Sequence, residues 1–217
     1  QTCGRAAAGP RGPDACMSLS LVTAPQGEPI TLEEAKAYTH ITTTDDDGLL
    51  DGLVTTARQA FDGRDAWFGR ALLTQTWEFT LPAFPPAAPS YAEWSSSTCG
   101  LAIIMPLPPL QSIAWIQYVD AAGAVQTLAT SAYTVDTKVE PGRLYPAVGT
   151  TWPGTQSTPN AVTIRFVAGY GLAKQVPREI RNWLLQAVGY LYMNRAAASL
   201  PSNFFWSLAK YRVTWGI

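Results

Sequence analysis

The stretch Leu73-Thr74-Gln75-Thr76-Trp77-Glu78-Phe79-Thr80-Leu81 divides the sequence, because the spacing of apolar residues changes there. Leu73, Trp77, Phe79 and Leu81 fall on one side of an alternating pattern, and threonines and a glutamate fall on the other. This period of two is typical of a half-buried β-strand. Helical spacing precedes the stretch and strand-like spacing follows it, so it marks the boundary between two kinds of structure.

Two helices are predicted upstream of this boundary. Thr31-Leu32-Glu33-Glu34 has the pattern of a capping box and predicts a short helix ending near His40. Asp45-Asp46-Asp47 predicts a second helix start, because carboxylates favour the first turn. The residues that follow at helical spacing are Leu49, Leu50, Leu53, Val54, Ala57, Ala60 and Phe61. We expect this amphipathic helix to end near Gly69.

Short strands and one helix are predicted downstream. The strands are expected at 101–105, 112–119, 125–128, 133–135 and 161–168, with a Pro- and Ser-rich loop at 82–98. Pro141-Gly142-Arg143 is interpreted as a turn. After Gly171 an apolar stripe predicts a helix: Ile180, Trp183, Leu184, Ala187, Val188, Leu191 and Tyr192.

The order of these elements predicts an α+β fold. A small helical bundle, made of two N-terminal helices and one C-terminal helix, carries a β-rich insert and an extended C-terminal tail. The expected segments are 1–16, a leader or extension of unknown role, then helices at 17–72 and the insert at 73–172, followed by the C-terminal helix at 173–202 and the tail at 203–217.

Composition favours a protein that makes contacts with other proteins. Charged residues are only 14% of the 217 residues, against about 25% in ordinary soluble domains. Eight Trp and nine Tyr suit interfaces, although core packing also uses them. Cys3, Cys16 and Cys99 lack the spacing of a zinc site, and their odd number argues against a disulfide framework. No apolar run is long enough to predict a membrane span.

The charges are unevenly distributed along the chain, whose formal net charge is −1. Nine acidic and three basic residues between Glu28 and Asp65 give a local net charge of −6. Six basic residues and one acidic residue from Lys174 to Ile217 give +5. The two parts are electrostatic complements, and one thin domain is not expected to neutralise them fully. We therefore expect charge pairing between neighbouring copies of the chain. The residues predicted to take part are Glu33, Glu34, Asp45, Asp46, Asp51, Arg178, Arg181 and Arg195.

The sequence offers little for catalysis. His40 is the only histidine, and no nucleophile or base can be assigned to it. The Asp45–Asp47 cluster is the one candidate metal site, but consecutive helical residues point about 100° apart and cannot all bind one ion. Helix capping is the favoured interpretation. We expect no catalytic residue, no metal and no cofactor.

Several motifs together resemble a known family of particle proteins. They are Leu32–Lys36, Gly69–Trp77, Pro106–Ile113, Tyr118–Asp120, Tyr133–Thr137, Glu140–Leu144, Trp152-Pro153, Ala168–Gly171, Val176–Ile180 and Leu191–Arg195. In this order they resemble the head–tail connector, or adaptor, proteins of long-tailed phages, prophages and gene transfer agents. The resemblance runs roughly from Leu19 to Val213. Residues 1–16 and the Ser-rich loop 90–98 show no family pattern.

The resemblance implies a structural protein and not an enzyme. Such proteins are expected to form a ring, of twelve copies, beneath the portal protein. The implied partners are the portal, other copies of the chain, and a stopper or tail terminator on the tail side. DNA would pass through the channel without tight binding. The implied location is the head–tail interface of the virion, with assembly in the bacterial cytoplasm. A metal-dependent nuclease and a monomeric binding module of a phage particle remain alternatives.

The C-terminal tail is the predicted portal-docking element, because Pro201 and Ser202 separate it from the helix and it is unusually apolar. The predicted docking residues are Phe204, Phe205, Trp206, Leu208, Tyr211, Arg212, Val213, Trp215 and Ile217. Deletion of 208–217 is expected to abolish docking and to leave the subunit folded. The alternative is that the tail folds back onto its own subunit and completes the core.

Overall fold

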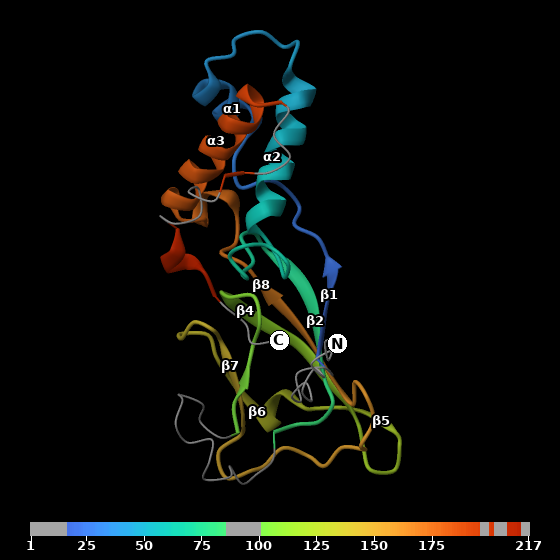
Figure 1. Cartoon of the computed structure of the whole chain (residues 1–217). Coiled ribbons are helices and arrows are strands. Elements are labelled where there is room, and N and C mark those ends of the chain that lie inside the picture. Colours follow the sequence, from blue (N-terminus) through green and yellow to red (C-terminus); the bar gives the residue numbers. More distant parts are fainter. Residues whose placement is uncertain (1–16, 86–100, 196–199, 202–207, 214–217) are drawn as a thin grey trace, which may run out of the picture.

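A helical bundle stands on one end of a pair of β-sheets in a computed structural model of the chain (Figure 1). The structure describes residues 17–85, 101–195, 200–201 and 208–213. The elements within this part of the chain are β1 (Ser18–Thr23), α1 (Leu32–Thr39), α2 (Asp47–Phe61), β2 (Gln75–Leu81), β3 (Ile103–Ile104), β4 (Leu110–Val119), β5 (Val125–Thr127), β6 (Tyr133–Asp136), β7 (Arg143–Pro146), β8 (Val162–Ala168) and α3 (Arg178–Met193). The predicted α+β class is confirmed.

The capping box predicted for α1 is present. The Glu34 N–H donates to the Thr31 hydroxyl at 3.1 Å, and the Thr31 N–H donates to the Glu34 carboxylate at 3.0 Å. The helix ends at His40, which has the left-handed φ of 57° that closes many helices.

The prediction for α2 is correct at its start and wrong at its end. Asp46 is the N-cap, as the acidic cluster suggested, but its side chain makes no capping hydrogen bond. The helix ends at Phe61 and not near Gly69. Asp62 is already extended, and Gly63 takes a φ of 108° that glycine adopts without strain. The backbone therefore leaves the helix eight residues earlier than the apolar pattern suggested.

The bundle core forms where α2 and α3 face one another. The fully buried side chains of α3 meet those of α2 across this contact: Ile180, Leu184, Ala187 and Val188 on one side, and Leu50, Val54, Ala57 and Phe61 on the other. Burial of one such large apolar side chain contributes about 1.5–3 kcal/mol. Gly189 lets α1 approach, since a Cβ at this position would lie 2.9 Å from the Tyr38 ring.

The larger sheet has the strand order β1-β2-β8-β4-β5, with every neighbouring pair antiparallel. Strand β2 alternates between buried and half-buried residues, as its sequence predicted. Strand β1 was not predicted, because Leu19 is its one buried residue and the pattern is therefore weak. The predicted helical segment 17–72 thus begins with a strand that belongs to the sheet.

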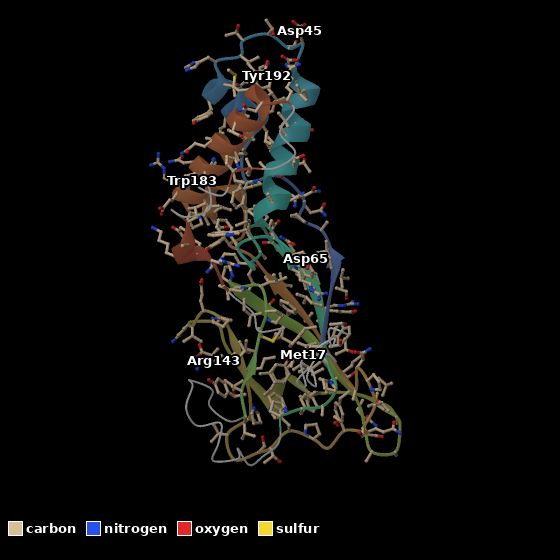
Figure 2. All side chains as sticks on the ribbon, viewed as in Figure 1. Met17, Asp45, Asp65, Arg143, Trp183 and Tyr192 are labelled. Atoms are coloured by element: carbon tan, nitrogen blue, oxygen red, sulfur yellow. The ribbon has the colours of Figure 1, made fainter. Side chains whose placement is uncertain are left out.

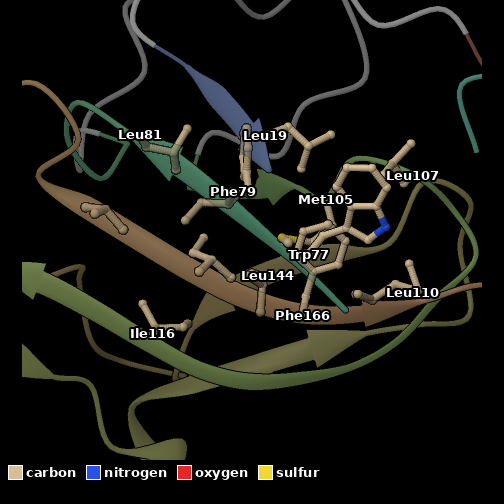
Figure 3. Close-up of a cluster of buried hydrophobic side chains, with 14 of the residues drawn as sticks. Leu19, Trp77, Phe79, Leu81, Met105, Leu107, Leu110, Ile116, Leu144 and Phe166 are labelled. Carbon is tan, nitrogen blue, oxygen red and sulfur yellow. The ribbon is translucent and has the colours of Figure 1, made fainter. Parts of the chain in front are cut away.

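A second sheet, in the order β3-β7-β6, covers one face of the first and encloses the larger core (Figure 3). Trp77, Phe79 and Phe166 of the first sheet pack in one cluster with Leu144 of the second. The interpretation of Arg143 as part of a turn was wrong, because β7 begins there.

A polar network joins the bundle to the sheet. The Asp62 carboxylate, just after α2, accepts the Leu72 N–H at 2.9 Å and the Gln75 side-chain amide at 2.7 Å. Gln75 in turn accepts the Trp77 indole N–H at 3.2 Å. Burial raises the pKa of Asp62, while these donors and Arg58 act in the opposite direction. The network fixes the end of α2 to the start of β2.

Candidate docking surface at the base of the helical bundle

Half of the residues predicted to pair between copies have a partner within their own chain. Glu34 forms an ion pair with Arg181, whose Nε also donates to the Pro29 carbonyl at 3.0 Å. Asp46 lies 3.7 Å from Arg195 and accepts the Tyr192 hydroxyl at 2.6 Å. These four residues are therefore paired within one subunit, and their pairing between copies stays a prediction. Helices α1 and α3 run side by side in the bundle, which brings these pairs together (Figure 1).

The Arg181 pair affects the titration of Glu34. Partial burial acts to raise its pKa, but the Thr31 N–H and the Arg181 guanidinium together hold the pKa below its ordinary value. Its ionised form is therefore favoured in the fold.

Glu33, Asp45, Asp51 and Arg178 are exposed, and within the described residues the structure shows no ion pair to any of them. Asp45 lies at the end of the bundle that is far from the sheets, near Tyr192 (Figure 2). Arg178 begins α3 at the opposite end. Pairing between copies remains a prediction for these four residues.

The described part of the predicted docking tail packs on its own subunit. Leu208 is completely buried in the bundle core. Tyr211 lies edge-on to Phe68, with ring centroids 6.4 Å apart, and the Val213 N–H donates to the Phe68 carbonyl at 2.8 Å. The assignment of Leu208 as an available docking residue is therefore wrong. From residue 208 to residue 213 the chain follows the alternative in which the tail folds back.

Five of the predicted docking residues lie outside the described residues: Phe204, Phe205, Trp206, Trp215 and Ile217. The Arg212 side chain is exposed, with its guanidinium 5.3 Å from the centre of the Trp67 ring.

Arg70 connects the C-terminal segment to the rest of the molecule. Only 4% of this residue is exposed, and its guanidinium makes three hydrogen bonds. Its Nε donates to the Tyr211 carbonyl at 2.7 Å, and its Nη1 donates to the Tyr170 hydroxyl at 2.6 Å and to Glu140 at 3.0 Å. Burial raises the pKa of Tyr170, although the Arg70 charge acts to lower it. No motif in the sequence pointed to this role of Arg70.

Positive charge gathers around this segment. Four basic residues at the base of α3 and on the C-terminal segment are exposed: Lys174, Arg178, Lys210 and Arg212. Glu179 accepts the Tyr211 hydroxyl at 3.1 Å and pairs with Lys210 at 2.6 Å, and the hydrogen bond from Lys210 holds the pKa of Glu179 below its ordinary value. The base of the bundle therefore offers exposed cations beside a segment held in place.

Metal-ligating and histidine side chains are spread apart in the described part of the chain. Within the described residues, no three His, Cys, Asp or Glu side chains lie close enough to hold a metal ion. His40 is an exposed residue at the end of α1. Among the described helices, none has the length and apolar character needed to cross a bilayer.

Comparisons with known proteins identify the fold. No protein-family model and no curated protein matches the chain. Solved structures do match, over 92% of this chain and 97% of each neck or virion chain. They are "Neck of empty GTA particle computed with C6 symmetry" (TM-score 0.68, 20% identity), "Virion of native gene transfer agent (GTA) particle" (TM-score 0.67, 21% identity) and "Neck of native GTA particle computed with C12 symmetry" (TM-score 0.58, 18% identity). The chain shares the fold of these neck and virion chains.

Proposed function

We propose that the chain is a structural subunit of the neck of a virus-like particle, and that it works there as an adaptor. In this role copies of the chain form a ring of twelve beneath the portal protein. The ring joins the head to the tail-side stopper or tail terminator and leaves a channel for DNA. The protein would be assembled in the bacterial cytoplasm and retained in the virion.

The similarity to the neck chains is the observation that carries this proposal. It extends over 97% of each of those chains, so the bundle, the sheets and their order are all included. Two of the neck structures were computed with sixfold and twelvefold rotational symmetry. Rotational symmetry requires unlike surfaces of neighbouring copies to meet and the contacts to close.

The base of the bundle is the surface we propose for the portal. Residues 208–213 are held there by contacts with their own subunit. In the sequence, the predicted docking residues Phe204, Phe205 and Trp206 precede this segment, and Trp215 and Ile217 follow it. The exposed cations Lys210 and Arg212 suit a partner surface that carries carboxylates.

The mass of the complex with the portal tests the proposal. The chain is mixed with its purified portal, and the mass of the complex gives the number of bound copies. We expect twelve copies for each portal ring. A single bound copy, or no binding, would contradict the adaptor role and would favour a monomeric binding module.

A further inference from the structure

Strand β1 forms one edge of the larger sheet, and no strand in the described part of the chain pairs with its outer side. An open edge exposes N–H and C=O groups that another chain can bond, and natural proteins usually protect it with charged residues or proline. The sequence of β1, Ser-Leu-Ser-Leu-Val-Thr, contains neither. Leu21 and Val22 are 48% and 42% exposed, and the bulge in the pairing with β2 comes only after Leu21. Residues 18–21 therefore form a regular, unprotected edge.

The hydrogen bonds of β8 show how the main-chain groups of the sheet are directed. The Val119 N–H donates to the Ala161 carbonyl at 2.8 Å, and the Gly169 N–H donates to the Pro109 carbonyl at 2.9 Å. At both ends of β8, therefore, a residue with an odd number bonds the β4 side. Because successive residues of a strand direct their main-chain groups to opposite sides, the even-numbered residues of β8 bond β2.

The same alternation identifies the free groups of β1. The residues of β2 that lie opposite the even-numbered residues of β8 have odd numbers, so the even-numbered residues of β2 bond β1. Ser18 and Ser20 lie opposite two of these residues. The N–H and C=O groups of Leu19 and Leu21 therefore point away from the sheet, and within the described residues no hydrogen bond to them is seen.

A pocket beside β1 suits an apolar side chain. It has a volume of about 470 Å³, and its walls include Leu19, Leu21 and Trp77 together with the turn at residues 62–66. A strand added to β1 places every second side chain on the face that Leu19 and Leu21 share. The edge therefore fits an extended segment that carries an apolar residue at one of these alternate positions.

The charges on the two sides of the molecule indicate which partner covers β1. Asp51 on α2 and Asp65 in the turn after α2 are exposed, and Asp65 lies on the β1 side of the molecule (Figure 2). The base of α3, which begins with the exposed Arg178, lies on the opposite side (Figure 1). Copies arranged head to tail bring such unlike sides together, and opposite charges favour that contact. A second copy of the chain is therefore the partner that complements the β1 side.

We propose that β1 is an assembly edge: in the ring it receives an extended segment of the neighbouring copy as an added strand, through the main-chain groups of Leu19 and Leu21. This inference rests on the proposed function, which supplies the ring. In such a contact the main-chain hydrogen bonds provide affinity, and the pocket beside Trp77 selects the side chain that enters it.

Hydrogen exchange at single residues tests the assembly edge. It is measured in the isolated subunit and in the ring assembled on purified portal. The Leu19 and Leu21 N–H groups should exchange rapidly in the isolated subunit and at least about tenfold more slowly in the ring. The Ser20 N–H is the internal control, because it bonds β2 in both states and should change much less.

Proline substitutions at the two edges of the sheet test the same contact. Leu21→Pro removes an outward N–H without loss of a bond to β2, and edge strands tolerate proline. Thr127→Pro is the matched control on β5, where Gln126 bonds β4 and the Thr127 N–H points outward. Both variants should stay folded, as judged by their melting temperatures. We expect Leu21→Pro to weaken ring assembly about tenfold, whereas Thr127→Pro should change it less than about twofold.

The outcomes separate the inference from the proposed function. If no ring forms on the portal, both are wrong. If a ring forms and the Leu19 and Leu21 N–H groups still exchange rapidly, only the assembly edge is wrong. Slow exchange already in the isolated subunit would show that the chain covers its own edge, and would also overturn it. So would protection that appears only when a further particle protein is added to the ring. If Leu21→Pro fails to fold, Leu21→Lys decides, because it keeps the N–H but adds the charge that protects natural edges.

Discussion

The sheet end and the helical end of the molecule both enclose an apolar core, but they differ in their ion pairs. At the sheet end, rings such as Trp77, Phe79 and Phe166 fill the core, and Glu78 of β2 pairs with Arg165 of β8. At the helical end, ion pairs connect α1, α2, α3 and the C-terminal segment. Apolar burial is insensitive to salt and mild acid, whereas ion pairs respond to both. The stability of the helical end is therefore expected to depend more on salt and pH than that of the sheet end.

The largest expected effect comes from breaking the join between the two ends. Gly169, where β8 leaves the sheet, has a φ of 120°, and a Cβ there would lie 2.1 Å from the Leu73 carbonyl oxygen. Gly169→Ala should reduce the free energy of unfolding by about 4 kcal/mol or more, because strain and a backbone clash combine. Urea denaturation measures this. The control is Gly52→Ala on α2, where the space is open and alanine should add about 0.5–1 kcal/mol.

The next effect tests whether the C-terminal segment belongs to the helical core. Leu208→Ala should destabilise the subunit by about 2–4 kcal/mol, because it empties a fully buried site. Leu172→Ala, at a side chain 78% exposed, should cost almost nothing. Equal stability of the two variants would show that Leu208 is not core. Because Leu208 is buried, we now expect deletion of residues 208–217 to destabilise the subunit, contrary to the expectation from the sequence.

A smaller effect on stability is expected when the pH is lowered. Against the effect of partial burial, the Thr31 N–H and the Arg181 guanidinium hold the pKa of Glu34 in the fold below its ordinary value of 4.5. The stability that Glu34 contributes is therefore present above about pH 4.5 and is lost as the pH falls below it. Glu34→Gln preserves the capping-box pattern but loses the Arg181 ion pair. Its melting temperature should be lower than that of the original protein at pH 6, and the difference between the two should shrink as the pH falls below the ordinary pKa of a glutamate. Glu33→Gln, on the exposed neighbour, is the control and should change the melting temperature at pH 6 much less than Glu34→Gln does.

The smallest effect on the isolated subunit is expected from reversing the exposed charges of the bundle, such as Asp51 on α2 and Arg178 on α3. Asp51→Lys and Arg178→Glu should each change the stability of the monomer by no more than about 0.5 kcal/mol. They should slow assembly on the portal and change its salt dependence, because exposed charges mainly set association rates. Lys138→Glu is the matched reversal at the sheet end and should leave assembly unchanged. Equal assembly rates for all three variants would exclude charge pairing between copies.

Local patterns in the sequence predicted most of the elements. The capping box at Thr31 and the alternation from Leu73 to Leu81 depend on neighbouring residues, and both are present as expected. The exposed strand β1 and the early end of α2 lacked such a pattern.

The candidate site could not be predicted in the same way. Glu34 and Arg181 are 147 residues apart, and only the packing of α1 on α3 brings them together. An apolar C-terminal segment has the same sequence pattern whether it covers its own subunit or a partner. Arg70 has no motif around it, and its importance comes from the carbonyl of a residue 141 positions away.

An image of the protein bound to its portal shows whether the chain works as a ring-forming adaptor. We expect a closed, rotationally symmetric ring in which the base of the bundle, with Arg212 and Val213, faces the portal. Single copies bound without symmetry, or a ring whose β5 side faces the portal, would contradict it.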